Sequence, residues 1–161
     1  YEYFPAVKWI LKVNDDFFVR VEEISNYLLN QYDSDQAVLV GGDIRYRHGA
    51  HVSGKWKEVP QYPRGAHHPP FPLGSFGHAV TRPISSFVAT HQAALFDYQG
   101  EDVSIGIWLQ ATPTAPKVQF KQTMHMKNNG DCFQPHHYVV GHEVTPQKMK
   151  QCQQRQSQPQ G

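Results

Sequence analysis

The residues best suited to chemistry are three consecutive polar side chains, Asn14, Asp15 and Asp16, which follow the apolar segment 9–13. Such an apolar run is typical of a buried strand, and the strand must leave its sheet where the polar residues begin. Ligands of open α/β sheets bind beyond the carboxyl ends of the strands, and clustered oxygen donors suit a hard cation such as Mn²⁺ or Mg²⁺. An ordinary turn between a strand and a helix would use the same residue types.

The elements that must position these residues alternate between short apolar runs and amphipathic segments, which indicates a mixed α/β fold. Ile10 and Leu11 predict a buried first strand, and Val21, Ile24 and Leu28 fall on one face of a first helix. We predict a first strand that ends near Val13 and further strands over 37–40, 77–81, 118–120 and 138–140. Helices are predicted over 19–32, 84–95 and 102–110.

The remaining local signals concern helix starts and loops. Asp102 is predicted as the N-cap of the third helix, and Thr145 as the N-cap of a short last helix. The segment 43–63 is predicted to be a β-ribbon over the sheet. The Pro- and Gly-rich segment 62–77 is predicted to be a loop with fixed turns, and a loop of this length in a compact domain is usually functional.

Composition limits the classes of protein. With 161 residues, 39% of them hydrophobic, the chain is long enough for one domain with a buried core. Its 15 basic and 14 acidic residues give a formal charge of +1, so no basic field favours nucleic acid as a partner. Cys132 and Cys152 could form one disulfide in an oxidising compartment or remain apart. No apolar run approaches the roughly 20 residues of a membrane span, and the Gln-rich segment 151–161 is predicted to be a disordered tail.

Ten histidines raise the question of a zinc site. They include His48, His51 and the pairs at 67–68 and 136–137, but none of them has the spacing of an HExxH or Cys₂His₂ site. We therefore expect exposed loop histidines rather than metal ligands in these positions.

Several motifs occur in a specific order along the chain. Asn-Asp-Asp follows a strand, a loop from Tyr-Pro to Pro-Pro-Phe leads into a Gly-His-Ala-Val-Thr strand, Glu-Asp-Val opens a helix, and a His precedes a Thr-Pro-x-x-Met helix. In this order and spacing the sequence resembles the C-terminal two thirds of the β-1,3-galactosyltransferase family, which includes β-1,3-N-acetylglucosaminyltransferases and fringe-type enzymes. The matching segments are 12–19, 55–56, 62–63, 69–71, 77–81, 101–106 and 142–149.

The resemblance implies a GT-A type fold with a mixed central sheet, in which residues 1–150 form the C-terminal portion of the catalytic domain and its N-terminal part is missing. It implies an inverting hexosyltransferase that moves galactose or N-acetylglucosamine from a UDP-sugar donor to a hydroxyl of a glycan acceptor on protein or lipid, in β-1,3 linkage. It also implies the lumenal side of the Golgi membrane, with a type II anchor that lies outside this chain.

The same resemblance implies a metal site. A diphosphate leaving group gains negative charge as the glycosidic bond breaks, and a divalent cation neutralises that charge. By resemblance, Asn14, Asp15 and Asp16 bind the UDP-sugar with its Mn²⁺, Asp16 is the carboxylate ligand of the metal, and His142 is the second protein ligand. Asn14 replaces an acidic residue of the family, which removes a negative charge and is expected to weaken cation binding.

Inversion requires a base on the face of the sugar opposite the leaving group. The family assigns that role to the position of Asp102, with Glu101 as the competing candidate, although an aspartate there would cap the helix in either case. Phe71, Gly74 and Gly77 are expected to line the sugar pocket, because glycines allow close approach of the backbone and an aromatic face can stack on a pyranose ring. A rigid proline turn packed against the core would explain the same three residues.

Two classes of function therefore remain. The first is a metal-dependent UDP-sugar hexosyltransferase. The second is a non-catalytic glycan-binding or pseudoenzyme domain of the same fold, because Asn14 and an insertion at 64–68 depart from the family pattern. Release of UDP that requires both Mn²⁺ and a sugar acceptor would separate the enzyme from the binding module.

Overall fold

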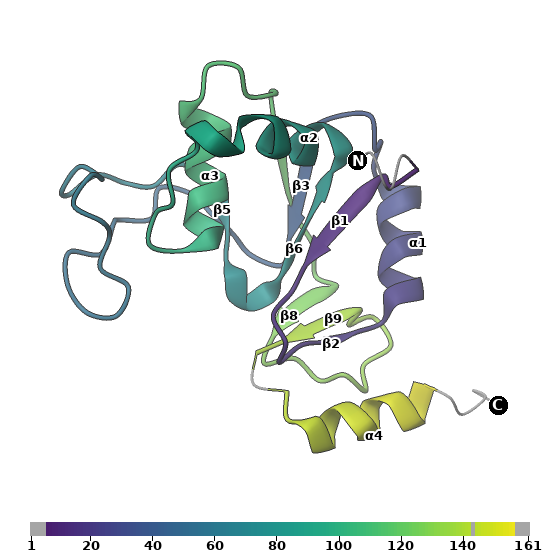
Figure 1. Ribbon diagram of the computed structural model, residues 1–161. Coiled ribbons are helices and arrows are strands. Elements are labelled where there is room, and N and C mark those ends of the chain that lie inside the picture. Colours follow the sequence, from purple (N-terminus) through teal and green to yellow (C-terminus); the bar gives the residue numbers. More distant parts are fainter. Residues whose placement is uncertain (1–5, 143, 157–161) are drawn as a thin grey trace.

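A mixed four-stranded sheet lies at the centre of the computed structural model, which describes residues 6–142 and 144–156 (Figure 1). The strands are, in spatial order, β1 (Trp9–Lys12), β6 (His78–Thr81), β3 (Val38–Gly41) and β7 (Gln119–Gln122). Strand β6 is antiparallel to both β1 and β3, and β7 is parallel to β3. The expected α/β architecture with a mixed central sheet is confirmed.

Two smaller sheets flank the first. One has three strands, in which β2 (Phe18–Val19) is antiparallel and β8 (Met126–Asn128) parallel to the central strand β9 (Val139–Gly141). The other pairs β4 (Ile44–Arg45) with β5 (Phe71–Pro72). The chain between β1 and β2 therefore crosses from the central sheet to the three-stranded sheet, and the Asn-Asp-Asp segment lies on this crossing.

Helices cover both faces of the central sheet. Val38 and Val40 of β3 point to the α1 side, where they join a core with Ile24 and Leu28, whereas Leu39 points to a core under α2 and α3. Figure 1 shows the same arrangement, with α1 on one side of the strands and α2 and α3 on the other. The helices are α1 (Val21–Gln31), α2 (Arg82–His91), α3 (Glu101–Ala111) and α4 (Pro146–Gln156), with 3₁₀ turns η1 (Gly74–Phe76) and η2 (Gln92–Ala94).

The first strand and helix are less buried than predicted. Ile24 and Leu28 are buried as expected, but Val21 is 68% exposed and Ile10 is 44% exposed. For Ile10 the cause is topological, because β1 is the edge strand of its sheet in the described part of the chain. An edge strand lacks neighbours on one side, so its apolar pattern alone overestimates burial.

Asp102 is not the N-cap of α3, as the sequence had suggested. The helix begins at Glu101 with the extended residue Gly100 as its N-cap, so Asp102 lies inside the first turn. Its carboxylate Oδ1 still accepts a hydrogen bond from the Val103 N–H at 2.8 Å. The residue therefore satisfies a first-turn donor from within the helix, which leaves its second oxygen for another partner.

The segment 43–63 is not a β-ribbon. Only Ile44 and Arg45 form a strand, β4, and from Tyr46 onward the chain forms a long loop that is closed by an isolated β-bridge between Gly49 and His67. We call residues 46–68 the pocket loop. Its glycines and prolines interrupt the alternation that a longer ribbon would need.

The C-terminal prediction was wrong for residues 151–156, which belong to α4. Cys152 is buried and forms a disulfide with Cys132, and the Arg155 guanidinium lies 5.0 Å from the centre of the Phe133 ring. These contacts anchor a helix that has few apolar side chains. Thr145 caps it as predicted, because the Lys148 N–H donates to the Thr145 hydroxyl at 3.3 Å.

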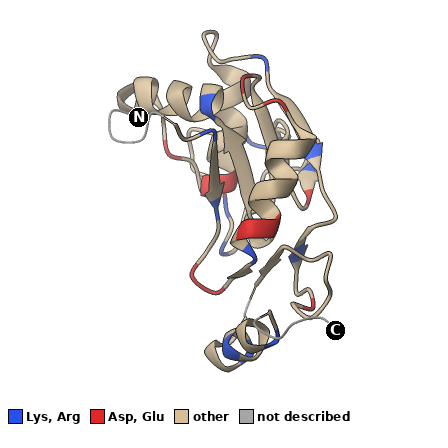
Figure 2. Ribbon diagram, turned by 90° about the vertical axis from the view of Figure 1, so that its right-hand side faces the viewer, with Lys and Arg blue, Asp and Glu red and all other residues tan. Residues whose placement is uncertain are grey.

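Residues 157–161 of the predicted tail and Glu143 of the last matching segment lie outside the described residues. Basic and acidic segments are interspersed along the ribbon in Figure 2, in keeping with the formal charge of +1. Among the residues described, no helix combines the length and the apolar character that crossing a bilayer requires.

Candidate active site

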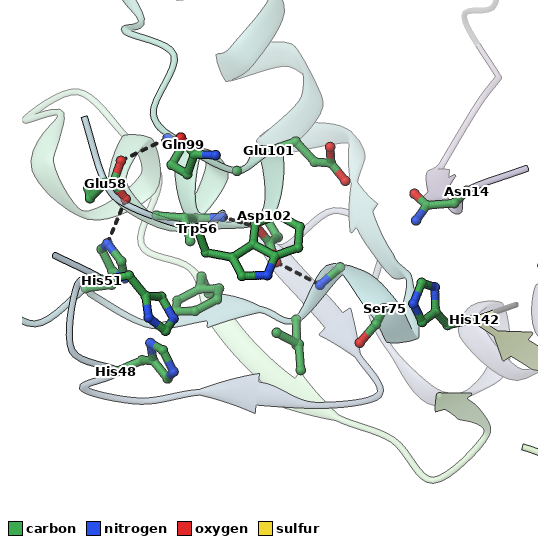
Figure 3. Close-up of a pocket in the computed structure, with 16 residues that line it drawn as sticks. Asn14, His48, His51, Trp56, Glu58, Ser75, Gln99, Glu101, Asp102 and His142 are labelled. Carbon is green, nitrogen blue, oxygen red and sulfur yellow. Dashed lines mark hydrogen bonds and ion pairs between the residues drawn. The ribbon is translucent and has the colours of Figure 1, made fainter. Parts of the chain in front are cut away.

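A pocket of about 540 Å³ opens where β1 ends and α3 begins, and most of the predicted site residues surround it. Figure 3 shows Asn14 and His142 at one end, His48 and His51 at the other, and Asp102 between them. We call these the polar end and the histidine end. A volume of this size is typical of small-ligand sites.

The polar end brings together the two predicted metal ligands. The His142 Nδ1 atom lies 3.2 Å from the Asp16 Oδ2 atom, and both side chains are partly exposed. Asp16 comes from the crossing between β1 and β2, and His142 directly follows β9. Asp16 itself does not line the pocket, but it contacts His142, which does.

This pair has the geometry and chemistry of two neighbouring metal ligands. Two adjoining ligands of an octahedral cation, each about 2.1 Å from it, lie about 3 Å apart. A carboxylate oxygen suits Mn²⁺, and an imidazole nitrogen is a common ligand of transition metals in general. No group of three or more His, Cys, Asp or Glu side chains that could hold a metal occurs among residues 6–142 and 144–156. Among these residues, Asp16 and His142 supply two ligands, and oxygens of water or of a bound anion would complete the coordination of a cation.

Lys12 connects the Asn-Asp-Asp segment to α3, a role that the sequence did not reveal. Its ammonium group donates to the Asn14 side-chain oxygen at 2.8 Å and forms an ion pair with the Glu101 carboxylate. Asn14 and Glu101 line the pocket, whereas Asp15 is exposed and does not. The polar end therefore contains a cationic side chain in addition to the Asp16–His142 pair.

Asp102 is the best-positioned carboxylate in the pocket. Its Oδ2 atom accepts a hydrogen bond from the Gly74 N–H at 2.9 Å, so two backbone donors hold the group in place. A Cβ atom on residue 74 would lie 3.2 Å from the same oxygen, which explains the glycine. Glu101 is more exposed and is paired with Lys12. The geometry therefore favours Asp102 over Glu101 as a fixed proton acceptor.

Phe71 and Gly77 serve packing more than the pocket surface. Phe71 lines the pocket but is only 3% exposed, with its ring perpendicular to those of His48 and His68. Gly77 does not line the pocket. It has φ of +73°, and a Cβ atom there would lie 3.2 Å from the Lys12 carbonyl oxygen. The alternative of a turn packed against the core describes Gly77 better than the sugar-pocket prediction.

The histidine end was missed by the sequence because the pocket loop has no regular periodicity. It contains the buried side chains of Glu58 and His68, whose Oε2 and Nε2 atoms are 2.9 Å apart. The same loop carries Trp56, which lines the pocket and is 57% exposed. His68 is therefore not an exposed loop histidine as expected. Burial lowers the pKa of His68, an effect that the hydrogen bond to Glu58 partly opposes.

A second histidine is buried close to the polar end. His78 pairs with Lys12 across β1 and β6 and is 5% exposed. Burial and the nearby Lys12 ammonium lower the pKa of His78 to about 4, although the Glu101 carboxylate opposes the shift. The imidazole is therefore neutral at physiological pH.

The mixed sheet, with its acidic residues and histidine gathered at the strand ends, is a GT-A type glycosyltransferase fold. The sequence model of the galactosyltransferase family matches residues 1–119, and the chain belongs to this family. The matched range includes the Asn-Asp-Asp segment and Asp102.

Similar proteins come from animals and plants. The chain is 35% identical to the human UDP-GalNAc:β-1,3-N-acetylgalactosaminyltransferase 2 over 102 residues, which cover 63% of this chain and 20% of the human protein. It is 27% identical to a hydroxyproline O-galactosyltransferase of Arabidopsis thaliana over 149 residues, which cover 89% of this chain and 21% of the plant protein. The chain thus spans about one fifth of the length of these relatives.

Proposed function

We propose that this chain forms the catalytic pocket of an inverting glycosyltransferase that moves galactose or an N-acetylhexosamine from a UDP-sugar to a sugar hydroxyl, in β-1,3 linkage. The observation that carries the proposal is the position of the fixed Asp102 carboxylate between two chemically different ends of one pocket. The names of the human and plant relatives include a UDP-linked donor, a β-1,3 linkage and galactosyl transfer, which supports this choice of reaction.

The polar end is assigned to the donor. Asp16 and His142 would hold a divalent cation such as Mn²⁺, which supplies positive charge against the diphosphate when bound. Lys12 adds a second positive charge close by, and its ion pair with Glu101 keeps that charge next to α3. Asn14 can donate or accept a hydrogen bond without adding negative charge, which suits a neighbour of a diphosphate.

Asp102 is assigned as the general base. An inverting transfer needs a carboxylate that takes the proton from the acceptor hydroxyl as the hydroxyl attacks the sugar carbon. The hydrogen bonds from the Gly74 and Val103 N–H groups hold the carboxylate in one orientation. Each carboxylate oxygen keeps a second acceptor position for the incoming hydroxyl.

The histidine end is assigned to the acceptor glycan. His48 and His51 provide hydrogen-bonding groups at this end, and Trp56 adds an exposed aromatic ring to the pocket lining. Aromatic faces and neutral polar groups are suited to a polyhydroxylated ring, which has both apolar C–H faces and hydroxyl edges. An acceptor bound here would direct a hydroxyl toward Asp102.

The disulfide between Cys132 and Cys152 supports a location in an oxidising compartment. We therefore place the enzyme on the lumenal side of the Golgi, held by a type II anchor outside this chain. A second candidate is a non-catalytic glycan-binding domain, which would also use the histidine end. It is favoured by Asn14, which removes one negative charge from the polar end, and by the insertion at 64–68.

A transfer assay tests the proposal. We expect the purified chain to release UDP from UDP-galactose, UDP-N-acetylglucosamine or UDP-N-acetylgalactosamine only when Mn²⁺ and a galactosyl or hexosaminyl acceptor are both present. Asp16→Ala should abolish the release, whereas Asp35→Ala, which removes an exposed carboxylate beyond α1, should not. Glycan binding that is independent of UDP-sugar and metal, without any release of UDP, would favour the binding module.

A further inference from the structure

Glu58 is a buried carboxylate with three hydrogen-bond donors around it. Its Oε1 atom accepts from the N–H groups of Val59 and Gln99, each at 2.9 Å, and its Oε2 atom lies 2.9 Å from the His68 Nε2 atom. The side chain is only 6% exposed. A carboxylate leaves water at a large energetic cost unless it is hydrogen-bonded in this way, so the arrangement needs all of these donors.

The donors come from two separate parts of the fold. Val59 and His68 belong to the pocket loop, whereas Gln99 directly precedes Gly100, the N-cap of α3. The Gln99 side-chain amide also donates to the Lys55 carbonyl oxygen at 3.2 Å. Two hydrogen bonds therefore fasten the start of α3 to the pocket loop, and a carboxylate beside a helix N-terminus also interacts favourably with the helix dipole.

The opposite side of the same turn is fastened by Asp102, which accepts a hydrogen bond from the Gly74 N–H. The first turn of α3, which contains Glu101 and Asp102, is thus held between η1 on one side and the pocket loop on the other. If either attachment is lost, the first turn of α3 can shift relative to the pocket, although its own helical hydrogen bonds remain.

We propose that Glu58 is a positioning residue for the transfer reaction, which acts through the Gln99 N–H to hold Asp102 in its working place between donor and acceptor. His68 completes the carboxylate's hydrogen bonds and fixes its orientation. This inference rests on the proposed function, in which Asp102 is the base. Glu58 itself does not need to touch substrate, and its charge is not used in the chemistry.

Three variants separate positioning from charge and from general destabilisation. Glu58→Ala removes the acceptor of the Gln99 N–H. Glu58→Gln keeps an amide oxygen in the same place but removes the charge. Thr81→Val is the matched control, because the buried Thr81 hydroxyl also holds two backbone groups, those of Gln36 and Val38, at the far end of β6.

The readout is kcat per UDP-binding site, with the sites counted by UDP titration so that unfolded protein does not contribute. Misplacing a catalytic group by about 1 Å can reduce a rate about 100-fold, and we expect a loss of this order in Glu58→Ala with the Kd for UDP changed less than about threefold. Glu58→Gln should retain kcat within about fivefold, and Thr81→Val should match the unaltered chain. Glu58→Asp, which is too short to reach all three donors, replaces the alanine variant if that variant does not fold.

Equal kcat per site in Glu58→Ala and Thr81→Val would overturn the proposal, and so would an equal loss in Glu58→Gln and Glu58→Ala. Amide hydrogen exchange at Gln99 provides a readout without catalysis. The Gln99 amide should exchange slowly in the unaltered chain and in Glu58→Gln, and much faster in Glu58→Ala. If neither the unaltered chain nor any variant transfers sugar, the proposed function fails, but the exchange pattern still tests the attachment of α3. An unprotected Gln99 amide in the unaltered chain would contradict that attachment.

Discussion

Replacing His78 by phenylalanine should remove the pH-dependent contribution that this buried imidazole makes to the free energy of unfolding. His78 is buried beside Lys12, and its pKa falls from 6.5 to about 4 in the folded chain. Because the folded state resists protonation, the stabilising contribution is complete above the unfolded pKa of 6.5 and is lost as the pH falls from 6.5 toward 4. Linkage between these two pKa values gives a loss of about 2 kcal/mol between pH 7 and pH 5.

Urea unfolding at pH 7 and pH 5 measures this term. The unaltered chain should lose about 2 kcal/mol more than His78→Phe over this interval. The contribution of His68, whose pKa is also lowered by burial, is present in both proteins and cancels in the comparison. Altered packing in the variant would change its stability at both pH values but not the difference between them. Equal losses in the two proteins would refute the assignment of a neutral, buried His78.

Two further predictions concern the ends of the molecule and of the pocket. Replacing Cys132 and Cys152 together by serine opens a loop with a sequence separation of 20 residues, which should reduce the free energy of unfolding by about 3 kcal/mol. The α4 amides should then be the first to exchange. Unchanged stability would mean that other contacts hold α4. Trp56→Ala should raise the KM for a sugar acceptor about tenfold without changing the Kd for UDP, whereas Tyr46→Ala, an exposed ring on the same loop that does not line the pocket, should change neither; equal effects of the two would contradict the acceptor assignment.

The sequence predicted the framework of the fold because that framework depends on local periodicity. The apolar run at 37–40 became β3, and the spacing of Ile24 and Leu28 placed them on the buried face of α1. The burial of Ile10 was overestimated for a reason that local patterns do not contain, namely the position of β1 at the edge of the sheet. Strand order is a property of the whole chain rather than of one segment.

The candidate site also contains residues that the sequence could predict and residues that it could not. Asp16 and His142 are 126 positions apart in the numbering, and only the order of family motifs suggested that they meet, as their 3.2 Å contact now indicates. Glu58 and His68 lie in an irregular loop with no motif to connect them, so their burial could not be foreseen. Asp102 was expected at the helix start for its capping ability, but the Gly74 N–H and not a cap determines where its second oxygen lies.

The most direct test of the central claim compares donor binding with sugar transfer in Asp102→Asn. The asparagine keeps the size of the side chain but cannot act as a base, and its one oxygen accepts only one of the two backbone hydrogen bonds, while Asp16 and His142 are left intact. We expect this variant to bind UDP with Mn²⁺ as tightly as the unaltered chain and to transfer sugar at least 100-fold more slowly, in line with the usual contribution of a general base, about 10²–10⁴-fold. Transfer at an unaltered rate by Asp102→Asn would contradict the account of one pocket with a donor end, an acceptor end and a base between them.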